Sequence, residues 1–311
     1  MRNRLLLLVL SLSGLSSFAQ QTDTVWFNHK WEKSPKEGSS YYRITSKNGD
    51  LFHVTDYYKN GQIQMTGTYL SMETETKNGA FKWYYQNGQK KSESNYINNE
   101  EVGVSNNFFM NGVLQKTFVN DDNSKISTGI SCKSGKLIYQ ADSLGNVMVK
   151  DGNGHAIETG DLVEEGDYKD GLKHGFWTGK KTEGNFWYKE QYNLGNLISG
   201  ESNENGILYK YEKADQQPQF KGGFEGFYKF LQKKVTYPAK AVSNKITGKV
   251  YLTFVVEKDG TLTEIKVKNS VHPLLDNEAV RVMNNSPKWI PGTQHGLPVR
   301  VSYNIPISFN L

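Results

Sequence analysis

Residues 248–267 read GKVYLTFVVEKDGTLTEIKV and predict a β-hairpin. In the first half of this stretch every second side chain is apolar, the spacing of a strand with one buried face: Val250, Leu252, Phe254 and Val256. Asp259-Gly260 suits a tight turn, and a second strand follows with apolar side chains at Leu262, Ile265 and Val267. The hairpin has one apolar face, so other elements must cover it.

A helix is predicted on each side of this hairpin. The upstream helix has apolar residues at i, i+3, i+4, i+7 and i+11, the spacing of one buried stripe: Phe224, Phe227, Tyr228, Leu231 and Val235. It should end before Tyr237-Pro238, because proline disfavours helical angles in the residue before it. The downstream helix can begin at Pro273, and its predicted apolar face consists of Leu275, Ala279, Val282 and Met283.

A last strand follows, with apolar residues at alternate positions: Val299, Val301, Tyr303, Ile305, Ile307 and Phe309. The order strand, strand, helix, strand limits the topology, because a helical crossover should be right-handed and place the last strand beside the first. We therefore predict an α+β domain at residues 219–311, with helices and a three-stranded antiparallel sheet. Its last strand would lie at an open edge.

Pro306 predicts which backbone groups of that strand are free. Proline has no N–H and is tolerated in a strand when its nitrogen faces away from the ladder. The even-numbered residues should then point their N–H and C=O groups outward, while the odd-numbered residues pair with the neighbouring strand. An extended partner would be held mainly by its main chain, the mode called β-augmentation. The predicted partner-binding edge comprises Val299, Arg300, Val301, Ser302, Tyr303, Asn304 and Ile305.

Residues 219–311 resemble the C-terminal domain of TonB. The motifs that carry the resemblance are Phe220-Lys-Gly-Gly223, Tyr237-Pro-Ala239, Gly248-Lys-Val250, Leu275-Asp-Asn-Glu-Ala-Val-Arg281, Pro287-Lys-Trp-Ile-Pro-Gly292, Gly296-Leu-Pro-Val299 and Pro306-Ile-Ser-Phe309. The positions singled out among them are Tyr237, Pro238, Trp289, Pro291 and Gly292. The resemblance implies that the last strand pairs with a short extended segment of an outer-membrane TonB-dependent transporter or another envelope protein, and that an inner-membrane proton-channel complex is a further partner.

The chain departs from a typical TonB in two respects. Lys233-Lys-Val-Thr236 replaces the glutamine-bearing stretch that the family has before Tyr-Pro. A typical TonB also has a long proline-rich segment, whereas this chain has eight prolines in 311 residues, most of them after residue 218.

Residues 22–213 contain a repeat. Glycines that close similar turns lie 27, 24 and 23 residues apart at Gly61, Gly88, Gly112 and Gly135, and a spacing of 24 recurs between Gly171 and Gly195. Asn-Gly and Asp-Gly pairs suit two-residue hairpin turns, and the flanking residues are rich in aromatic side chains. Because one hairpin cannot bury its aromatic face alone, we predict stacked β-hairpins. Gly79–Gly88 and Gly166–Trp177 resemble MORN repeats, which implies a hairpin solenoid but no particular activity.

The N-terminus predicts export. Arg2 and Arg4 precede an apolar run from Leu5 to Leu15, and small residues follow where a signal peptidase cleaves. We predict a signal peptide at residues 1–19 and a periplasmic protein. An uncleaved inner-membrane anchor is the alternative, but the run is shorter than the ~20 apolar residues of a spanning helix. Residues 214–218 differ in composition and are predicted to be a linker.

Composition and motifs favour a binding protein over an enzyme. The mean hydropathy of −0.64 excludes a multi-span membrane protein. Residues 20–214 carry 22 basic and 25 acidic side chains, whereas residues 215–311 carry 13 and 7, so the C-terminal part suits anionic partners. Nucleic acid is not expected as a partner, because the chain has no recognisable reading motif. The six histidines show no metal or triad spacing, and the single Cys132 is interpreted as a half-buried thiol.

We therefore predict no catalytic residues, no metal and no cofactor. The predicted function is that of a periplasmic TonB-like adaptor that acts in energy-coupled transport. The alternative is a free periplasmic scaffold or interaction protein without energy transduction.

Overall fold

The computed structural model describes residues 22–120 and 135–311. The protein is mostly β, with a long succession of antiparallel hairpins followed by an α+β region, which confirms the predicted fold class. The chain divides into two compact units, residues 1–150 and 151–311. The predicted linker at 214–218 lies inside the second unit, so the division into domains drawn from the sequence stays a prediction. The signal peptide and Cys132 lie outside the described residues.

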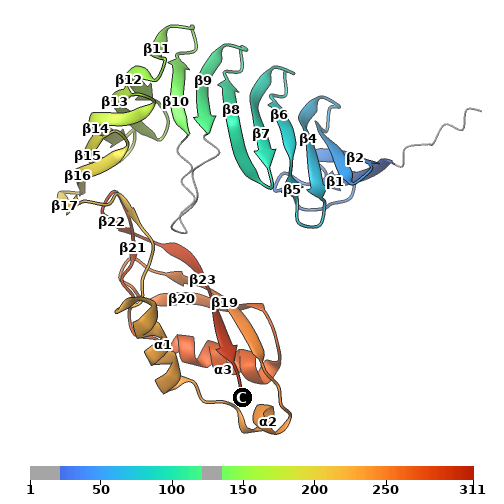
Figure 1. Ribbon diagram of the computed structural model, residues 1–311, viewed down its shortest axis with the longest axis vertical. Coiled ribbons are helices and arrows are strands. Elements are labelled where there is room, and N and C mark those ends of the chain that lie inside the picture. Colours follow the sequence, from blue (N-terminus) through green and yellow to red (C-terminus); the bar gives the residue numbers. More distant parts are fainter. Residues whose placement is uncertain (1–21, 121–134) are drawn as a thin grey trace, which may run out of the picture. The chain divides into compact units, whose positions relative to one another are not determined.

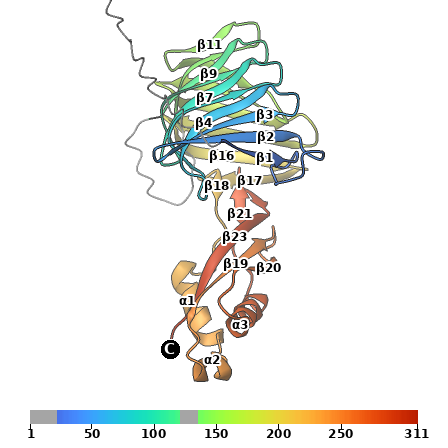
Figure 2. The same cartoon turned by 90° about the vertical axis from the view of Figure 1, so that its right-hand side faces the viewer.

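The first unit consists of strands that pair with their sequence neighbours in antiparallel order. Figure 2 shows β2, β3, β4, β7 and β9 following one another along the stack. The strands are β1 (Thr22–Phe27), β2 (Tyr41–Asn48), β3 (Leu51–Tyr58), β4 (Ile63–Ser71), β5 (Thr76–Lys77), β6 (Gly79–Tyr84), β7 (Lys90–Ile97), β8 (Glu100–Phe108), β9 (Leu114–Asn120), β10 (Lys136–Ala141) and β11 (Val147–Lys150).

The repeated glycine motif forms a different turn from the one predicted. After β3, the Tyr58 N–H donates to the Gln62 carbonyl at 2.8 Å, and the Gly61 N–H donates to the Tyr58 carbonyl at 2.9 Å. Gly61 has a φ of 88°, whereas Asn60 is not among the residues with positive φ. A two-residue turn of the predicted kind needs positive φ at both central residues, so this loop is a three-residue turn closed by a left-handed glycine. The same bonds recur after β6, β8 and β10.

Successive turns of the first unit are joined by side chains. The Tyr58 hydroxyl donates to the Tyr84 carbonyl at 2.8 Å, and the Tyr85 hydroxyl donates to the Phe108 carbonyl at 2.9 Å. Since a single hairpin is marginally stable, these bonds help to explain why hairpins are stacked at this period. Most of the predicted turn Cys132–Gly135 lies outside the described residues. An equivalent turn that ends at Gly145 was not predicted from the sequence.

A buried ion pair lies within the sheet of the first unit. The Arg43 guanidinium on β2 donates to both carboxylate oxygens of Asp56 on β3, at 2.7 and 2.9 Å. Both side chains are largely out of water, with 10% and 2% of their surfaces exposed. Glu75, which is mostly exposed, lies 3.4 Å from the same guanidinium. Burial raises the pKa of Asp56 even though the guanidinium opposes that shift.

The second unit begins with the remaining hairpins. Their strands are β12 (Asn153–Glu158), β13 (Leu162–Lys169), β14 (Leu172–Lys181), β15 (Phe186–Asn193), β16 (Asn196–Glu204) and β17 (Ile207–Tyr211). Here the predicted two-residue turns do occur: Asp170 and Gly171 have φ values of 53° and 79°, and Leu194 and Gly195 have 46° and 81°. The hairpins of the first unit and those of the second unit therefore have a similar glycine spacing but different turns.

Aromatic rings in these hairpins cover glycines on the neighbouring strand. Trp177 is paired with Gly166, and a methyl group on this glycine would lie 2.4 Å from the indole. Tyr188 is paired with Gly179, where the corresponding distance is 2.0 Å. Because a glycine leaves room for the ring to lie flat on the sheet, aromatic residue and glycine form one packing unit.

The C-terminal part of the second unit is α+β. Figure 1 shows its helices and strands in the orange and red part of the colour scale. The elements are β18 (Asp215–Gln216), α1 (Gly223–Lys234), α2 (Ala239–Ser243), β19 (Gly248–Val256), β20 (Leu262–Asn269), α3 (Pro273–Asn284), β21 (Gly292–Gln294), β22 (Leu297–Val299) and β23 (Val301–Phe309). One sheet has the order β20-β19-β23, as predicted, and another has the order β18-β21-β22.

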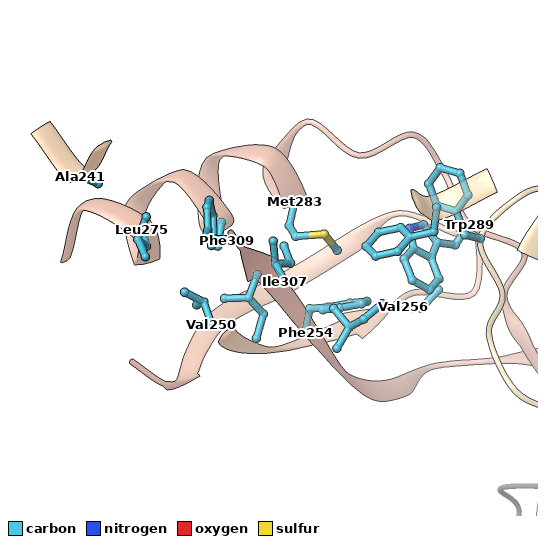
Figure 3. Close-up of a cluster of buried hydrophobic side chains, with 14 residues drawn as sticks. Ala241, Val250, Phe254, Val256, Leu275, Met283, Trp289, Ile307 and Phe309 are labelled. Carbon is cyan, nitrogen blue, oxygen red and sulfur yellow. The ribbon is translucent and has the colours of Figure 1, made fainter. Parts of the chain in front are cut away.

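The core of this part lies between the three-stranded sheet and the helices. Leu275 and Met283 of α3 point toward side chains of β19 and β23, including Val250 and Ile307 (Figure 3). All of the predicted inward positions of β19 and α3 are buried, which confirms the alternation and the helical stripe. Burial of this apolar surface is the main source of stability for the sheet.

The predicted stripe of α1 is wrong at two positions. Phe224 and Tyr228 are exposed, with 68% and 62% of their surfaces in contact with solvent, whereas Phe227 is buried. Phe230 and Leu231 pack beside Phe227 against the core. Phe220, which precedes the helix, and Phe227 both pack against Trp289, with ring centroids 5.6 Å apart in each pair.

The predicted linker contains ordered backbone. Asp215 and Gln216 form β18 and pair with Gln294 and Thr293 of β21. Its composition is polar, but its backbone groups are taken up by a neighbouring strand rather than by water alone. Asp215 and Gln216 are therefore a short edge strand of a small sheet.

Candidate partner-binding edge

β23 is the regular edge strand of the three-stranded sheet. It pairs with β19 over nine residues, from Val301 opposite Val256 to Phe309 opposite Gly248, with no shift of register. Among the described residues, β23 has no strand partner on its other side. A straight edge with unpaired backbone groups is a template for another extended chain.

The side chains of β23 alternate as predicted. Ile305, Ile307 and Phe309 are buried, whereas Ser302 and Asn304 are exposed. Pro306 lies opposite Tyr251 in the register, and its ring is exposed. The strand thus fixes its own position through its odd-numbered side chains and presents small polar side chains between them.

The start of the predicted edge differs from the structure. Val299 ends β22, and Arg300 lies between β22 and β23, so five of the seven predicted residues are in the edge strand. The Arg300 side chain bonds Glu257 at 3.0 and 3.1 Å and also contacts Glu264. Hydrogen bonds from Thr263 and Arg300 lower the pKa of Glu257, which keeps this carboxylate ionised. Arg300 therefore joins the strand to the β19–β20 hairpin.

The opposite edge of the sheet is less suited to strand addition. The pairing of β20 with β19 shifts register twice. Glu264 has a φ of 53°, which bends the strand, and three of the four exposed side chains along it are charged: Glu264, Lys266 and Lys268. Bulges and charges are common features of edges that do not pair. The geometry thus favours β23 over β20 as a pairing edge.

The family-motif positions hold the fold together instead of lining the edge. The Tyr237 hydroxyl donates to the Ile246 carbonyl at 2.6 Å, and its ring packs on Phe309. Pro238 precedes the first turn of α2. Trp289 is 5% exposed, and its indole N–H donates to Ser286 at 3.0 Å.

Gly292 of the same motif is buried where three segments meet. A methyl group on it would lie 2.7 Å from the Val301 side chain and 3.0 Å from the Gln216 carbonyl. Pro291, immediately before it, is half-buried and leads into β21. Gly292 therefore lies where β18, β21 and β23 approach one another closely.

The sequence reading missed the β21–β22 hairpin and α2. Each strand of the hairpin has three residues, too few for an alternation to be recognised. The sequence signal that could have revealed the hairpin is the pair His295-Gly296. In the structure these residues have φ values of 47° and 73° and form a two-residue turn. His295 also contacts Glu190, 105 residues earlier, which no local pattern could predict.

The described residues contain no group of three or more side chains arranged to hold a metal ion. In the same parts of the chain, no helix is both long and apolar enough to cross a membrane.

Comparison with known proteins identifies the C-terminal part. The family model described as Gram-negative bacterial TonB protein C-terminal matches residues 233–311. The NMR solution structure of the TonB C-terminal domain of Helicobacter pylori is 26% identical, and the match covers 27% of this chain and 76% of that chain, with a TM-score of 0.22. No curated protein matches the chain. Residues 233–311 therefore match the family of Gram-negative bacterial TonB C-terminal domains, and residues 219–311 are called the TonB-type domain below.

Proposed function

We propose that this protein is a periplasmic adaptor of the TonB type that binds an outer-membrane transporter, or another envelope protein, by strand addition to β23. Export would depend on the predicted signal peptide at residues 1–19, and binding would serve energy-coupled transport. The observation that carries the proposal is a straight nine-residue edge strand, open on one side within the described residues, in a domain of the TonB family.

The affinity expected from such an edge is modest. An added segment would form about five backbone hydrogen bonds, each with a net value of ~1 kcal/mol. Ordering the extended segment opposes this gain. The balance suggests a dissociation constant on the order of micromolar.

Replacement of Ser302 by proline tests the edge. Ser302 is paired with Val255, has an exposed side chain, and lies at an even-numbered position of the strand. Proline there removes an outward N–H while the ladder to β19 is kept, as it is at Pro306. We expect Ser302→Pro to weaken binding about tenfold or more, because a partner carbonyl also loses its donor. Fluorescence anisotropy of the full chain with peptides from the periplasmic segments of the organism's outer-membrane transporters would measure this.

Ser302→Ala is the matched control, since it shortens the same side chain and retains the N–H. Its affinity should equal that of the wild type. Unchanged binding by Ser302→Pro, with the fold verified by circular dichroism, would argue against β23 as the edge. Wild-type protein that binds none of these peptides would favour a scaffold without a transporter partner.

A further inference from the structure

The β21–β22 hairpin packs against the last repeat hairpins of the same unit. The imidazole of His295, at the tip of the hairpin, stacks on the ring of Tyr188 with centroids 4.0 Å apart and planes 12° from parallel. Leu297 joins a buried cluster with Phe186 and Tyr188 of β15. The TonB-type domain is thus connected to the repeats through side chains as well as through the chain itself.

A buried carboxylate lies at the centre of this contact. The Glu190 side chain has none of its surface exposed, and it accepts hydrogen bonds from Tyr192 and Tyr211, each at 2.9 Å. A third bond comes from His295, whose Nδ1 lies 2.8 Å from the carboxylate and must donate, since an ionised carboxylate only accepts. Burial opposes ionisation, but these bonds hold the pKa of Glu190 below its ordinary value. A buried charge needs such donors, and the hairpin supplies one of them.

Backbone contacts complete the attachment. The hydroxyl of Ser202, a fully buried residue on β16, donates to the His295 carbonyl at 2.7 Å. The Gly296 N–H donates to the Ala214 carbonyl at 3.2 Å. A methyl group on Gly296 would lie 2.4 Å from the Tyr211 ring, so the tip is closely fitted to β17. These contacts come from β15, β16, β17 and the segment before β18, so several elements hold the hairpin at once.

We infer that the β21–β22 hairpin is an internal docking element, in which His295 closes onto Glu190 and locks the TonB-type domain to the last repeats as one rigid body. A flexible linker, in contrast, would let the edge strand change its orientation relative to the last repeats freely. The inference does not depend on strand addition at β23, because all of its contacts lie within residues 151–311.

Amide hydrogen exchange of the full-length protein tests the inference. In His295→Ala, loss of a bond to a charged group should open the docked hairpin about ten- to a hundredfold more often. Exchange of the Gly296 and Thr293 amides should accelerate by that factor, while exchange in β19 stays as in the wild type. Such a difference would identify local opening of the hairpin, because amides of the domain core report global unfolding instead.

His155→Ala is the matched control. His155 also contacts a carboxylate, that of Asp167 at 2.8 Å, but it lies on an exposed surface of the same unit and should leave exchange at Gly296 unchanged. In a second variant, His295→Gln, the amide can still donate to Glu190, and part of the protection should return. No acceleration in His295→Ala would overturn the inference. Equal acceleration in β19 would overturn it as well, since the hairpin would then belong to the core and would not act as a separate lock.

Discussion

Trp289→Ala is expected to destabilise the TonB-type domain by about 3–5 kcal/mol, the usual cost of truncating a buried tryptophan. Trp289 packs at 5.4–5.7 Å, between ring centroids, against four aromatic rings from separate elements: Phe220, Phe227, Phe254 and Tyr303. Its backbone N–H also donates to the Gly260 carbonyl at 2.8 Å, where the turn between β19 and β20 comes too close for any side chain. Removal of the indole would leave a cavity where these elements meet.

Denaturant unfolding of the full-length protein, monitored through hydrogen exchange of the β19 amides, would measure this loss of stability. Trp187→Ala is a suitable control, because Trp187 lies on β15 with 38% of its surface exposed and should cost far less. Trp289→Phe should recover part of the stability. A Trp289→Ala protein that stays as stable as the wild type but fails to bind its partner would show that Trp289 is a contact residue instead of a core residue.

Asp56→Ala is expected to destabilise the first unit by about 3–5 kcal/mol, because it leaves the buried Arg43 guanidinium without its main counter-charge. Arg43 cannot lose its proton, and it lies over the rings of Phe27 and Tyr69, so it has no path to solvent that keeps this packing. Glu75 is its other acidic neighbour, but it is mostly exposed and 3.4 Å away.

The measurement is hydrogen exchange in β2 and β3 of the full-length protein under increasing denaturant. Glu75→Ala should cost less than about 1 kcal/mol, as exposed ion pairs do. The double substitution Arg43→Met/Asp56→Leu should be much less harmful than Asp56→Ala, because no unpaired charge remains. If Asp56→Ala, Glu75→Ala and the double variant were all as stable as the wild type, the ion pair would contribute nothing to the stability of this unit.

The elements predicted correctly from the sequence are those whose own residues decide them. Val250, Leu252, Phe254 and Val256 alternate over a full strand, and all four are buried. The helix that begins at Pro273 and the last strand were equally clear, because each has enough residues for its period to be recognised. The open edge followed from the order of these elements and from the handedness of the crossover.

The features that the sequence did not reveal depend on contacts between distant residues. The stripe predicted for α1 included Phe224 and Tyr228, but both are exposed, whereas Phe220, which lies before the helix, packs in the core against Trp289. The turns after β3, β6 and β8 were mistaken because Asn-Gly suits more than one hairpin loop. The contact of His295 with Glu190 joins strands that no local pattern relates.

The most direct test of strand addition at β23 is site-specific photocrosslinking in cells. A photoreactive residue at Asn304 would lie on the regular edge, and one at Lys266 would lie on the opposite, bulged edge; both positions are exposed. We predict that position 304 crosslinks to the periplasmic segment of an outer-membrane transporter, identified by mass spectrometry, and that position 266 does not. Equal crosslinking at both positions, or none at 304, would contradict the proposed function.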